Sequence, residues 1–286
     1  MTPLVTHPVT ARQLAAFAAQ PSHALLLHGP VGSGKSVIAD QLAATILDLE
    51  PEQLADYPYS LRLDGTIISA AAIEGVRQLE HFLSLRVPKS GMITRIVIIT
   101  DAQKLSRQAQ NALLKTIEEP PLATLLILTA PNQASVLPTI SSRLQVIQIK
   151  RPSQQALLDY FTDSKNTPTA VEQAYAISGG LPGLMAALLT NADHPLRPAT
   201  ETARNLLQQT IYERLLLVDE LAKQKPHVIN TLFILQQMAH ASLQTTAGAQ
   251  FNRWQLIMQA SYEASEQLNL SAQPKLVLDA LMLKLN

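Results

Sequence analysis

With 286 residues, 47% of them hydrophobic, the chain is long enough for two or three domains and can bury a sizeable core. Lys plus Arg and Asp plus Glu both number 22, so the formal net charge is zero, which argues against nucleic-acid binding by bulk charge alone. The sequence has no cysteine, which excludes disulfides and thiolate zinc sites.

The N-terminal 20 residues lack a basic segment followed by an apolar core, so they do not resemble a secretory signal. The longest apolar runs, such as Ile96–Ile99, have the length of a strand and are far too short to cross a membrane. The seven histidines are scattered, and we expect no histidine metal site. These features predict a soluble, cytoplasmic protein.

The first 150 residues alternate between strand-like and helix-like segments. A short apolar run at 24–28 predicts a strand that ends at Gly29, and a helix follows it, with Val37, Ile38, Leu42 and Ile46 on one face. Further strands are expected near 66–69 and at 94–100, 124–130 and 144–149. Because these runs are apolar on both faces, they predict an α/β fold whose five-stranded parallel sheet is covered by helices on both sides.

Residues 106–121 predict a short amphipathic helix. Ser106 is a suitable N-cap, and the prolines at 120–121 stop the helix. The apolar residues Ala109, Ala112, Leu113 and Ile117 recur at helical spacing.

Beyond Arg151-Pro152 the pattern is helical only. Residues 153–190 predict a small helical unit that is interrupted at 179–183, and the proline-containing stretch 191–200 predicts a linker. The remainder is helical, with one apolar face formed by Leu206, Leu207, Ile211, Leu215 and Val218. Three domains follow, at residues 1–152, 153–192 and 196–286.

A phosphate-binding loop stands between the first predicted strand and the first long helix. The residues are Gly29, Pro30, Val31, Gly32, Ser33, Gly34, Lys35 and Ser36, a full match to G-x-x-x-x-G-K-[ST]. Glycines let successive backbone N–H groups point inward around an anion, and the following helix adds its positive end. Lys35 is expected to reach the β- and γ-phosphates, and the Ser36 hydroxyl to bind Mg²⁺. ATP or ADP with magnesium is the predicted ligand; a glycine turn with a chance lysine is the alternative.

Residues 95–121 resemble the AAA+ clamp-loader family. Asn111–Pro121 matches the family's Asn-Ala-Leu-Leu-Lys-Thr-(Leu/Ile)-Glu-Glu-Pro-Pro almost letter for letter. The stretch 137–149 resembles the family's Pro-Thr-Ile-x-Ser-Arg-Cys block, with Leu144 in place of the cysteine. The resemblance implies an AAA+ nucleotide-binding domain at 1–152, a helical lid at 153–192 and a C-terminal oligomerisation domain at 196–286. It also implies a hetero-oligomer with gamma/tau- and delta-type subunits, a sliding clamp and primed DNA.

The acidic pair that cuts ATP in active members of this family is incomplete here. In one register, Thr100 and Asp101 stand where active loaders have Asp-Glu, of which the Asp helps to hold Mg²⁺ and the Glu orients the attacking water. In the other register Asp101 supports Mg²⁺ and Ala102 replaces the Glu. Either way the resemblance implies weak or absent hydrolysis by the chain itself.

Two further departures concern the sensor and the lid. The polar sensor after the fourth strand falls at Pro131, with Asn132 beside it. The lid motif Gly-x-x-Arg is here Gly180-Leu-Pro-Gly183, without the arginine. Both the Thr-Asp-Ala segment and this lid are typical of the delta-prime type of subunit. The intact phosphate loop leaves open that the chain binds a nucleotide without turning it over.

Arg143 is retained within the family's Ser-Arg block. The resemblance implies that it acts as an arginine finger, supplied in trans to the ATP of a neighbouring subunit. The alternative is a surface arginine that caps a helix or pairs with a carboxylate.

Many bacterial members insert a four-cysteine zinc module between the phosphate-loop helix and the second strand. The interval 47–65 is short here and cannot bind zinc through thiolates. Candidate DNA contacts, by position, are Arg86, Lys89, Lys104 and Arg107, although each is also compatible with an ordinary surface charge.

Two other functions remain. A gamma/tau-type loader ATPase would turn over its own nucleotide, and Thr100-Asp101-Ala102 together with Gly183 disfavours this. An unrelated P-loop kinase or signalling ATPase would leave the block at 111–121 and Arg143 unexplained.

Overall fold

The computed structural model describes residues 5–65, 72–87, 92–163, 166–190, 194–243, 246–270 and 272–285. The chain divides into two compact units, residues 1–153 and 154–286, and each is described by itself. Within the described ranges no helix is both long and apolar enough to span a membrane.

The first unit contains the predicted parallel sheet. Its strands are β1 (Ala24–His28), β2 (Ser60–Asp64), β3 (Arg95–Thr100), β4 (Thr124–Ala130) and β5 (Gln145–Gln148). They are parallel and lie in the order β2-β3-β4-β1-β5, which confirms the predicted five-stranded α/β fold.

The second strand differs in position from the prediction. The segment expected near 66–69 lies outside the described residues, and β2 is formed earlier, at Ser60–Asp64. Strand β2 lies at the edge of the sheet, and only its Leu63 side chain is buried. Apolar and polar residues therefore alternate along β2, and no continuous apolar run marks it in the sequence.

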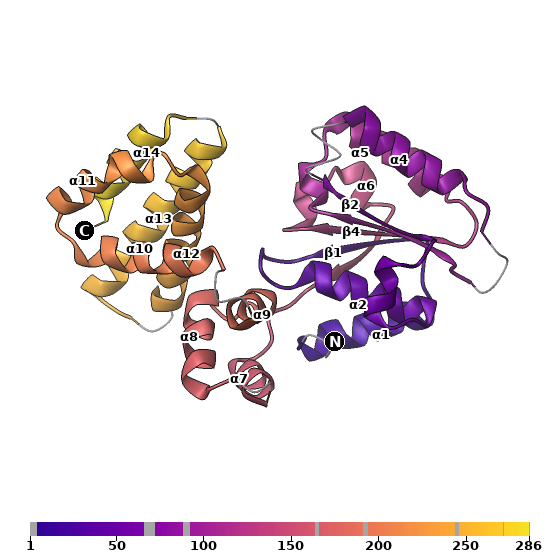
Figure 1. Ribbon diagram of the computed structural model, residues 1–286, viewed down its shortest axis with the longest axis horizontal. Coiled ribbons are helices and arrows are strands. Elements are labelled where there is room, and N and C mark those ends of the chain that lie inside the picture. Colours follow the sequence, from indigo (N-terminus) through magenta and orange to yellow (C-terminus); the bar gives the residue numbers. More distant parts are fainter. Residues whose placement is uncertain are drawn as a thin grey trace. The chain divides into compact units, whose positions relative to one another are not determined.

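Helices cover both faces of the sheet (Figure 1). Helices α4 (Ala72–Ser84) and α5 (Arg107–Glu118) lie on one face, and α1 (Pro8–Ala19) and α2 (Lys35–Leu47) on the other. Alternate strand residues, including Leu26, Val97, Ile99, Leu126 and Leu128, pack against α4, α5 and the one-turn helix α6 (Pro138–Ser141). The 3-10 turns are η1 (Pro51–Ala55), η2 (Ala102–Lys104) and η3 (Gln133–Ser135). This double cover explains why the central strands are apolar on both sides.

Helix α5 forms as the capping pattern predicts. The Ser106 hydroxyl accepts a hydrogen bond from the backbone N–H of Ala109 at 3.2 Å, and the helix ends at Glu118, just before Pro120. The side chains of Leu113 and Ile117 are buried in the core below it.

The second unit is all-helical. Its helices are α7 (Gln154–Asp163), α8 (Pro168–Ser178), α9 (Pro182–Thr190), α10 (Leu196–Gln208), α11 (Ile211–Leu221), α12 (Lys225–Leu243), α13 (Ala249–Asn269) and α14 (Pro274–Lys284). Helix α10 already begins at Leu196, so the predicted linker at 191–200 is too long; residues 191–193 are outside the described ranges. One core joins residues of α8 and α9 to those of α10–α14. A division of this unit into a lid and a C-terminal domain stays a prediction.

The apolar face expected across 206–218 belongs to two helices rather than one. Thr210 caps α11, and its side chain and that of Glu213 form a reciprocal capping box. As a consequence Leu206 and Val218 are each 1% exposed, whereas Ile211 and Leu215 are each 37% exposed. The chain leaves the helical conformation at residues 209–210, between α10 and α11. The spacing of the apolar residues alone does not reveal this break.

A buried arginine ties two helix ends together in this unit. The Arg214 side chain is 4% exposed, and its Nε donates to the carbonyl oxygen of Leu206 at 2.6 Å. Its Nη1 lies 3.4 Å from the carbonyl oxygen of Met282, close to the end of α14. Carbonyls near a helix C-terminus lack intrahelical partners and carry partial negative charge, so a guanidinium satisfies them.

Arg214→Ala should therefore destabilise the second unit by about 3 kcal/mol, because the carbonyl of Leu206 loses a charged donor and a cavity remains. The measurement is urea unfolding followed by fluorescence of Trp254, the sole tryptophan of the chain, which packs against the core of this unit. We expect the midpoint to fall by about 1–2 M urea.

Arg253→Ala is the matched control. Arg253 also donates to a carbonyl of α10, that of Leu207 at 3.2 Å, but it does so at the surface. Its removal should change stability by no more than about 0.5 kcal/mol. Equal effects of the two substitutions would show that burial of Arg214 is unimportant.

Candidate functional site

The phosphate loop has the strand-loop-helix geometry that its motif requires. Residues 29–34 connect the end of β1 to the start of α2 at Lys35. Gly32 and Gly34 have φ values of 84° and 82°, a region that favours glycine. A Cβ atom at Gly29 would lie 2.9 Å from the carbonyl oxygen of Ile149, so this position also needs glycine. The loop is curled tightly at the carboxyl edge of the sheet.

Lys35 is held in place by its own loop. The Nζ atom donates to the carbonyl oxygens of Gly29 at 2.7 Å and Pro30 at 2.9 Å. Burial lowers the pKa of the Lys35 ammonium, and the nearby Asp101 carboxylate acts in the opposite direction. An ammonium has three N–H donors, so two are used by the loop and one can serve a bound anion.

The polar groups of the loop fit a phosphate and a magnesium ion. The Ser33 hydroxyl is buried and has no hydrogen-bond partner within the described part of the chain. Such an orphaned group is expected where a ligand completes the contacts. Ser36, half-buried in the first turn of α2, supplies a hydroxyl of the kind that binds Mg²⁺ in such loops. The residues present therefore match the chemistry of a nucleotide with magnesium.

Thr100 and Asp101 reach the same edge of the sheet, but both are occupied by other contacts. The Thr100 hydroxyl lies 3.4 Å from the carbonyl oxygen of Leu63 in the edge strand β2. The Asp101 carboxylate pairs with Lys104 Nζ at 2.7 Å and accepts from Gln103 Nε2 at 3.2 Å. Both carboxylate oxygens of Asp101 are thus held by its own turn.

Thr129 belongs to this edge and was missed by the sequence analysis. Its buried hydroxyl accepts a hydrogen bond from the backbone N–H of Asp101 at 3.1 Å, on a strand that lies between β1 and β3. A polar residue inside the apolar run 124–130 was the available signal. By contrast, the predicted sensor positions Pro131 and Asn132 follow the end of β4.

The ends of β2 and β3 approach each other closely behind Asp101. A Cβ atom at Gly65 would lie 2.3 Å from the carbonyl oxygen of Asp101. Asp101 itself has φ 53°, in the left-handed region. The local backbone is therefore tightly constrained, and position 65 requires glycine.

Arg143 lies at the opposite edge of the sheet. It precedes β5 by two residues, and Leu25 pairs with Gln145, whereas the phosphate loop follows His28 at the other end of β1. The level of Gln145 is four residues of β1, about 13 Å, before that of Gly29, and Arg143 lies in the turn that precedes β5. Arg143 is therefore remote from the phosphate loop of its own chain.

The Arg143 side chain is 43% exposed and has two contacts. Nη2 pairs with Glu118 Oε1 at 2.9 Å, and Nη1 donates to the carbonyl oxygen of Thr139 at 2.9 Å. These are the contacts that the surface-arginine alternative expects. The 43% exposure of this side chain is also what a role in trans requires.

The three candidate DNA contacts that lie within the described residues do not gather at one place. Lys104 pairs with Asp101, and Arg107 starts α5 at the carboxyl edge, whereas Arg86 follows the end of α4 at the amino edge. Lys89 lies outside the described residues.

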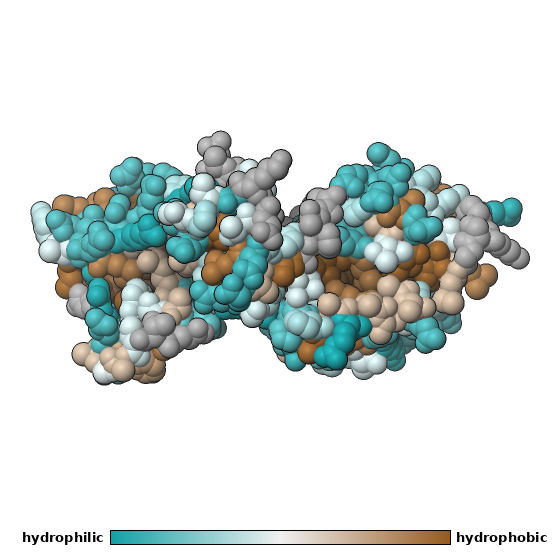
Figure 2. Space-filling view, turned by 90° about the horizontal axis from the view of Figure 1, so that it is seen from below, coloured by the Kyte–Doolittle hydropathy of each residue, from teal (hydrophilic) through white to brown (hydrophobic). Residues whose placement is uncertain are grey.

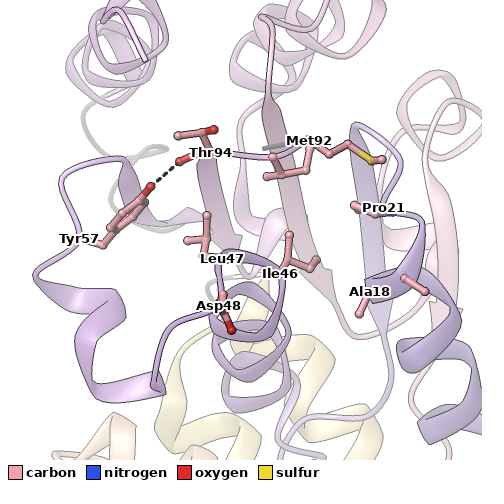
Figure 3. Close-up of a pocket in the computed structure, with 10 residues that line it drawn as sticks. Ala18, Pro21, Ile46, Leu47, Asp48, Tyr57, Met92 and Thr94 are labelled. Atoms are coloured by element: carbon pink, nitrogen blue, oxygen red, sulfur yellow. Dashed lines mark hydrogen bonds between the residues drawn. The ribbon is translucent and has the colours of Figure 1, made fainter. Parts of the chain in front are cut away.

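A hollow of about 380 Å³ is found at the amino edge, away from the phosphate loop (Figure 3). Its lining includes Ile46, Leu47 and Met92, and the Tyr57 hydroxyl donates to the carbonyl oxygen of Thr94 at 3.0 Å beside it. Asp48 is its one carboxylate. Lys35, Ser36 and Asp101 lie at the opposite, carboxyl ends of the strands, so we assign the candidate site to the phosphate loop. Among the described residues there is no cluster of three or more His, Asp or Glu side chains that could hold a metal ion.

Comparison with known proteins identifies relatives of the first unit. Residues 8–153, about half of the chain, match the family model described as DNA polymerase III, delta subunit. The DNA polymerase III subunit delta′ of Pseudomonas aeruginosa is 30% identical over 181 residues, which cover 57% of this chain and 55% of the relative. The subunit tau of Bacillus subtilis is 32% identical over 149 residues, covering 48% of this chain and 26% of the relative.

The chain spans about half the length of the curated delta′ relatives that it matches first. Among solved structures, a gamma subunit-related protein from Thermotoga maritima aligns with 97% of this chain and 99% of its own, at 16% identity and a TM-score of 0.46.

Proposed function

The chain belongs to the family described as DNA polymerase III, delta subunit, and from that membership we propose that it is a delta-prime-type subunit of the complex that loads the sliding clamp onto primed DNA. The observation that carries the proposal is an asymmetry between two edges of one sheet. The carboxyl edge has a complete phosphate loop but an occupied Asp101, and the amino edge exposes Arg143.

The phosphate loop is proposed to bind ATP or ADP with magnesium. Backbone N–H groups of 29–34 would surround the phosphates, Lys35 would contribute its remaining N–H, and the hydroxyl of Ser36 would contact Mg²⁺. ATP, but not ADP, would supply a γ-phosphoryl group, whose charge the Lys35 ammonium and magnesium would neutralise.

Hydrolysis by this chain should be weak. Thr100 and Ala102 have no carboxylate, so Asp101 supplies the single carboxylate of this segment where active loaders have two, and it is paired with Lys104. Helix α9 starts at Pro182 and contains no arginine or lysine. The nucleotide would then stabilise the fold or an interface.

Arg143 is proposed to act in trans on the ATP of an adjoining subunit. Its distance from its own phosphate loop and its exposure both support this role. A guanidinium can neutralise charge that develops on a γ-phosphate during hydrolysis.

The second unit is proposed to hold the hetero-oligomer together. Large hydrophobic side chains are exposed on its helices: Tyr212, Leu216, Leu256, Leu276 and Leu283. Brown patches are visible on this unit in the space-filling view (Figure 2). Partners would be gamma/tau- and delta-type subunits, with the sliding clamp and primed DNA bound by the assembled complex in the cytoplasm.

The gamma/tau-type ATPase remains the second candidate, because the tau relative is as similar in sequence as the delta′ relatives. The occupied Asp101 weighs against it. An unrelated P-loop kinase would share the phosphate loop but not the family match.

Reconstitution tests the proposed function. The chain is mixed with gamma/tau- and delta-type subunits of its own organism, and assembly is followed by size-exclusion chromatography with light scattering. We expect a stable hetero-oligomer that loads the clamp onto primed DNA, and omission of this chain should abolish loading. Full loading without the chain, or no incorporation of the chain, would contradict the proposal.

A further inference from the structure

The hydroxyl of Thr10 joins the N-terminal helix α1 to the end of β5. Thr10 is 0% exposed, and its Oγ1 donates to the carbonyl oxygen of Gln148 at 3.0 Å. The same oxygen accepts from the backbone N–H of Lys150 at 3.1 Å. One buried side chain therefore satisfies a carbonyl and an amide that lie 138 and 140 positions further along the chain.

Strand β5 has a place for such a partner because it lies at the edge of the sheet. Among the described strands it pairs with β1 alone, so backbone groups on its outer side have no strand to bond with. The N–H of Ile149 donates inward, to the carbonyl oxygen of His28 in β1 at 2.7 Å. The groups of Gln148 and Lys150 on either side of it face Thr10 instead. Thr10 thus occupies the position that a further strand would take.

The backbone between these two contacts borders the phosphate loop. Ile149 is 3% exposed, and its carbonyl oxygen lies 2.9 Å from the position that a Cβ atom of Gly29 would occupy. On its other side, the N–H of Gly29 donates to the carbonyl oxygen of Ala130 in β4 at 3.2 Å. The carbonyl of Gly29 accepts from Lys35 Nζ at 2.7 Å. Gly29 is therefore enclosed between β4 and the end of β5, and it orients the Lys35 ammonium.

We propose that Thr10 is a positioning residue for the phosphate loop. Thr10 holds the end of β5 against α1, and this fixes Ile149, against which Gly29 packs. Through Gly29 the same contact sets the position of the Lys35 ammonium. This role of Thr10 rests on the proposed binding of a nucleotide at the loop. It gives α1 a part in nucleotide binding that is carried by packed and hydrogen-bonded groups between the two.

Thr10→Val tests this role by titration of a fluorescent ATP analogue with magnesium into the isolated full chain. Valine keeps the branched shape of threonine but has no hydroxyl, so the backbone groups of Gln148 and Lys150 lose their partner. We expect the dissociation constant to rise about 3- to 10-fold. Thr10→Ser keeps the hydroxyl and should retain most of the wild-type affinity.

Thr124→Val is the matched control. Thr124 is 2% exposed at the start of β4, and its hydroxyl donates to the carbonyl oxygen of Leu122 at 3.2 Å. This contact lies at the amino edge of the same sheet, away from the phosphate loop. The control removes a buried hydroxyl from the same unit and should bind the analogue as the wild type does.

Hydrogen exchange of the Lys150 amide, followed by NMR, separates positioning from a purely structural role. Coupling between two sites is reciprocal, so if the Thr10 contact strengthens nucleotide binding, a bound nucleotide must strengthen the contact by the same factor. We expect a saturating amount of the ATP analogue to slow exchange of this amide about 3- to 10-fold in the wild type. In Thr10→Val the analogue should leave its exchange unchanged.

Wild-type affinity in Thr10→Val would refute the positioning role and leave nucleotide binding at the loop intact. Equal losses of affinity in Thr10→Val and Thr124→Val would also overturn it, because they would trace the effect to general destabilisation. If the wild type itself did not bind the analogue, nucleotide binding at the loop would be wrong, and the role of Thr10 with it. If Thr10→Val does not fold, the wild-type exchange experiment decides, since an analogue that binds without slowing the Lys150 amide contradicts the coupling.

Discussion

Arg143→Ala is expected to slow ATP hydrolysis at the adjoining subunit by about 10³-fold or more, while assembly remains intact. Arg143 is exposed, and its contacts are one surface ion pair and one backbone carbonyl, so its removal should cost the fold little. The large effect on rate would come from the loss of a guanidinium that neutralises charge only in the transition state. Binding of ATP at the adjoining site should change much less than turnover.

The measurement needs a complex in which the adjoining subunit alone retains a working phosphate loop, so that a single site is observed. Arg143→Lys should recover only part of the rate, because an ammonium lacks the planar, forked geometry of a guanidinium. Arg151→Ala, an exposed arginine in the same unit, is the matched control and should have the wild-type rate. A wild-type rate in Arg143→Ala would leave Arg143 as an ordinary surface arginine.

Local patterns in the sequence predicted much of the first unit. The strand-loop-helix arrangement around residues 29–36, the central strands and the Ser106 cap are determined by residues close in sequence, and the structure confirms these three features. Strand β2 was misplaced because an edge strand with one buried side chain has no apolar run. The break between α10 and α11 depends on a cap at Thr210, which the spacing of apolar residues obscures.

Contacts between distant residues could not be predicted in this way. Gln110 meets Leu137 across 27 positions, and Arg214 meets Met282 across 68. Each is a polar side chain on an otherwise ordinary amphipathic helix, and only the folded chain reveals its backbone partner. The pairing of Asp101 with Lys104 joins residues that are close in sequence. A surface lysine in a turn has many possible partners, however, so this ion pair also could not be predicted without the structure.

Lys35→Met is expected to weaken binding of a fluorescent ATP analogue about 100-fold in the isolated chain. The ammonium is already oriented by the carbonyls of Gly29 and Pro30, so its remaining N–H makes a charge-assisted hydrogen bond without a large ordering cost. The loss of a hydrogen bond to a charged partner corresponds to about 1.5–3 kcal/mol, or roughly 10- to 150-fold in affinity. Titration of the analogue in the presence of magnesium measures this change.

A comparison of the wild type with Lys35→Met also shows whether the chain hydrolyses ATP at its own site. Because Asp101 is held by Lys104 and Gln103, the wild type should hydrolyse ATP no faster than Lys35→Met, even at saturating ATP. Lys150→Met is the matched control, since Lys150 is exposed and lies next to Ile149, which borders Gly29; it should bind and behave as the wild type does. If the wild type turned ATP over much faster than Lys35→Met, the occupied carboxylate would have to be released during the reaction. The chain would then function as a gamma/tau-type ATPase, whose nucleotide drives a cycle instead of stabilising an interface.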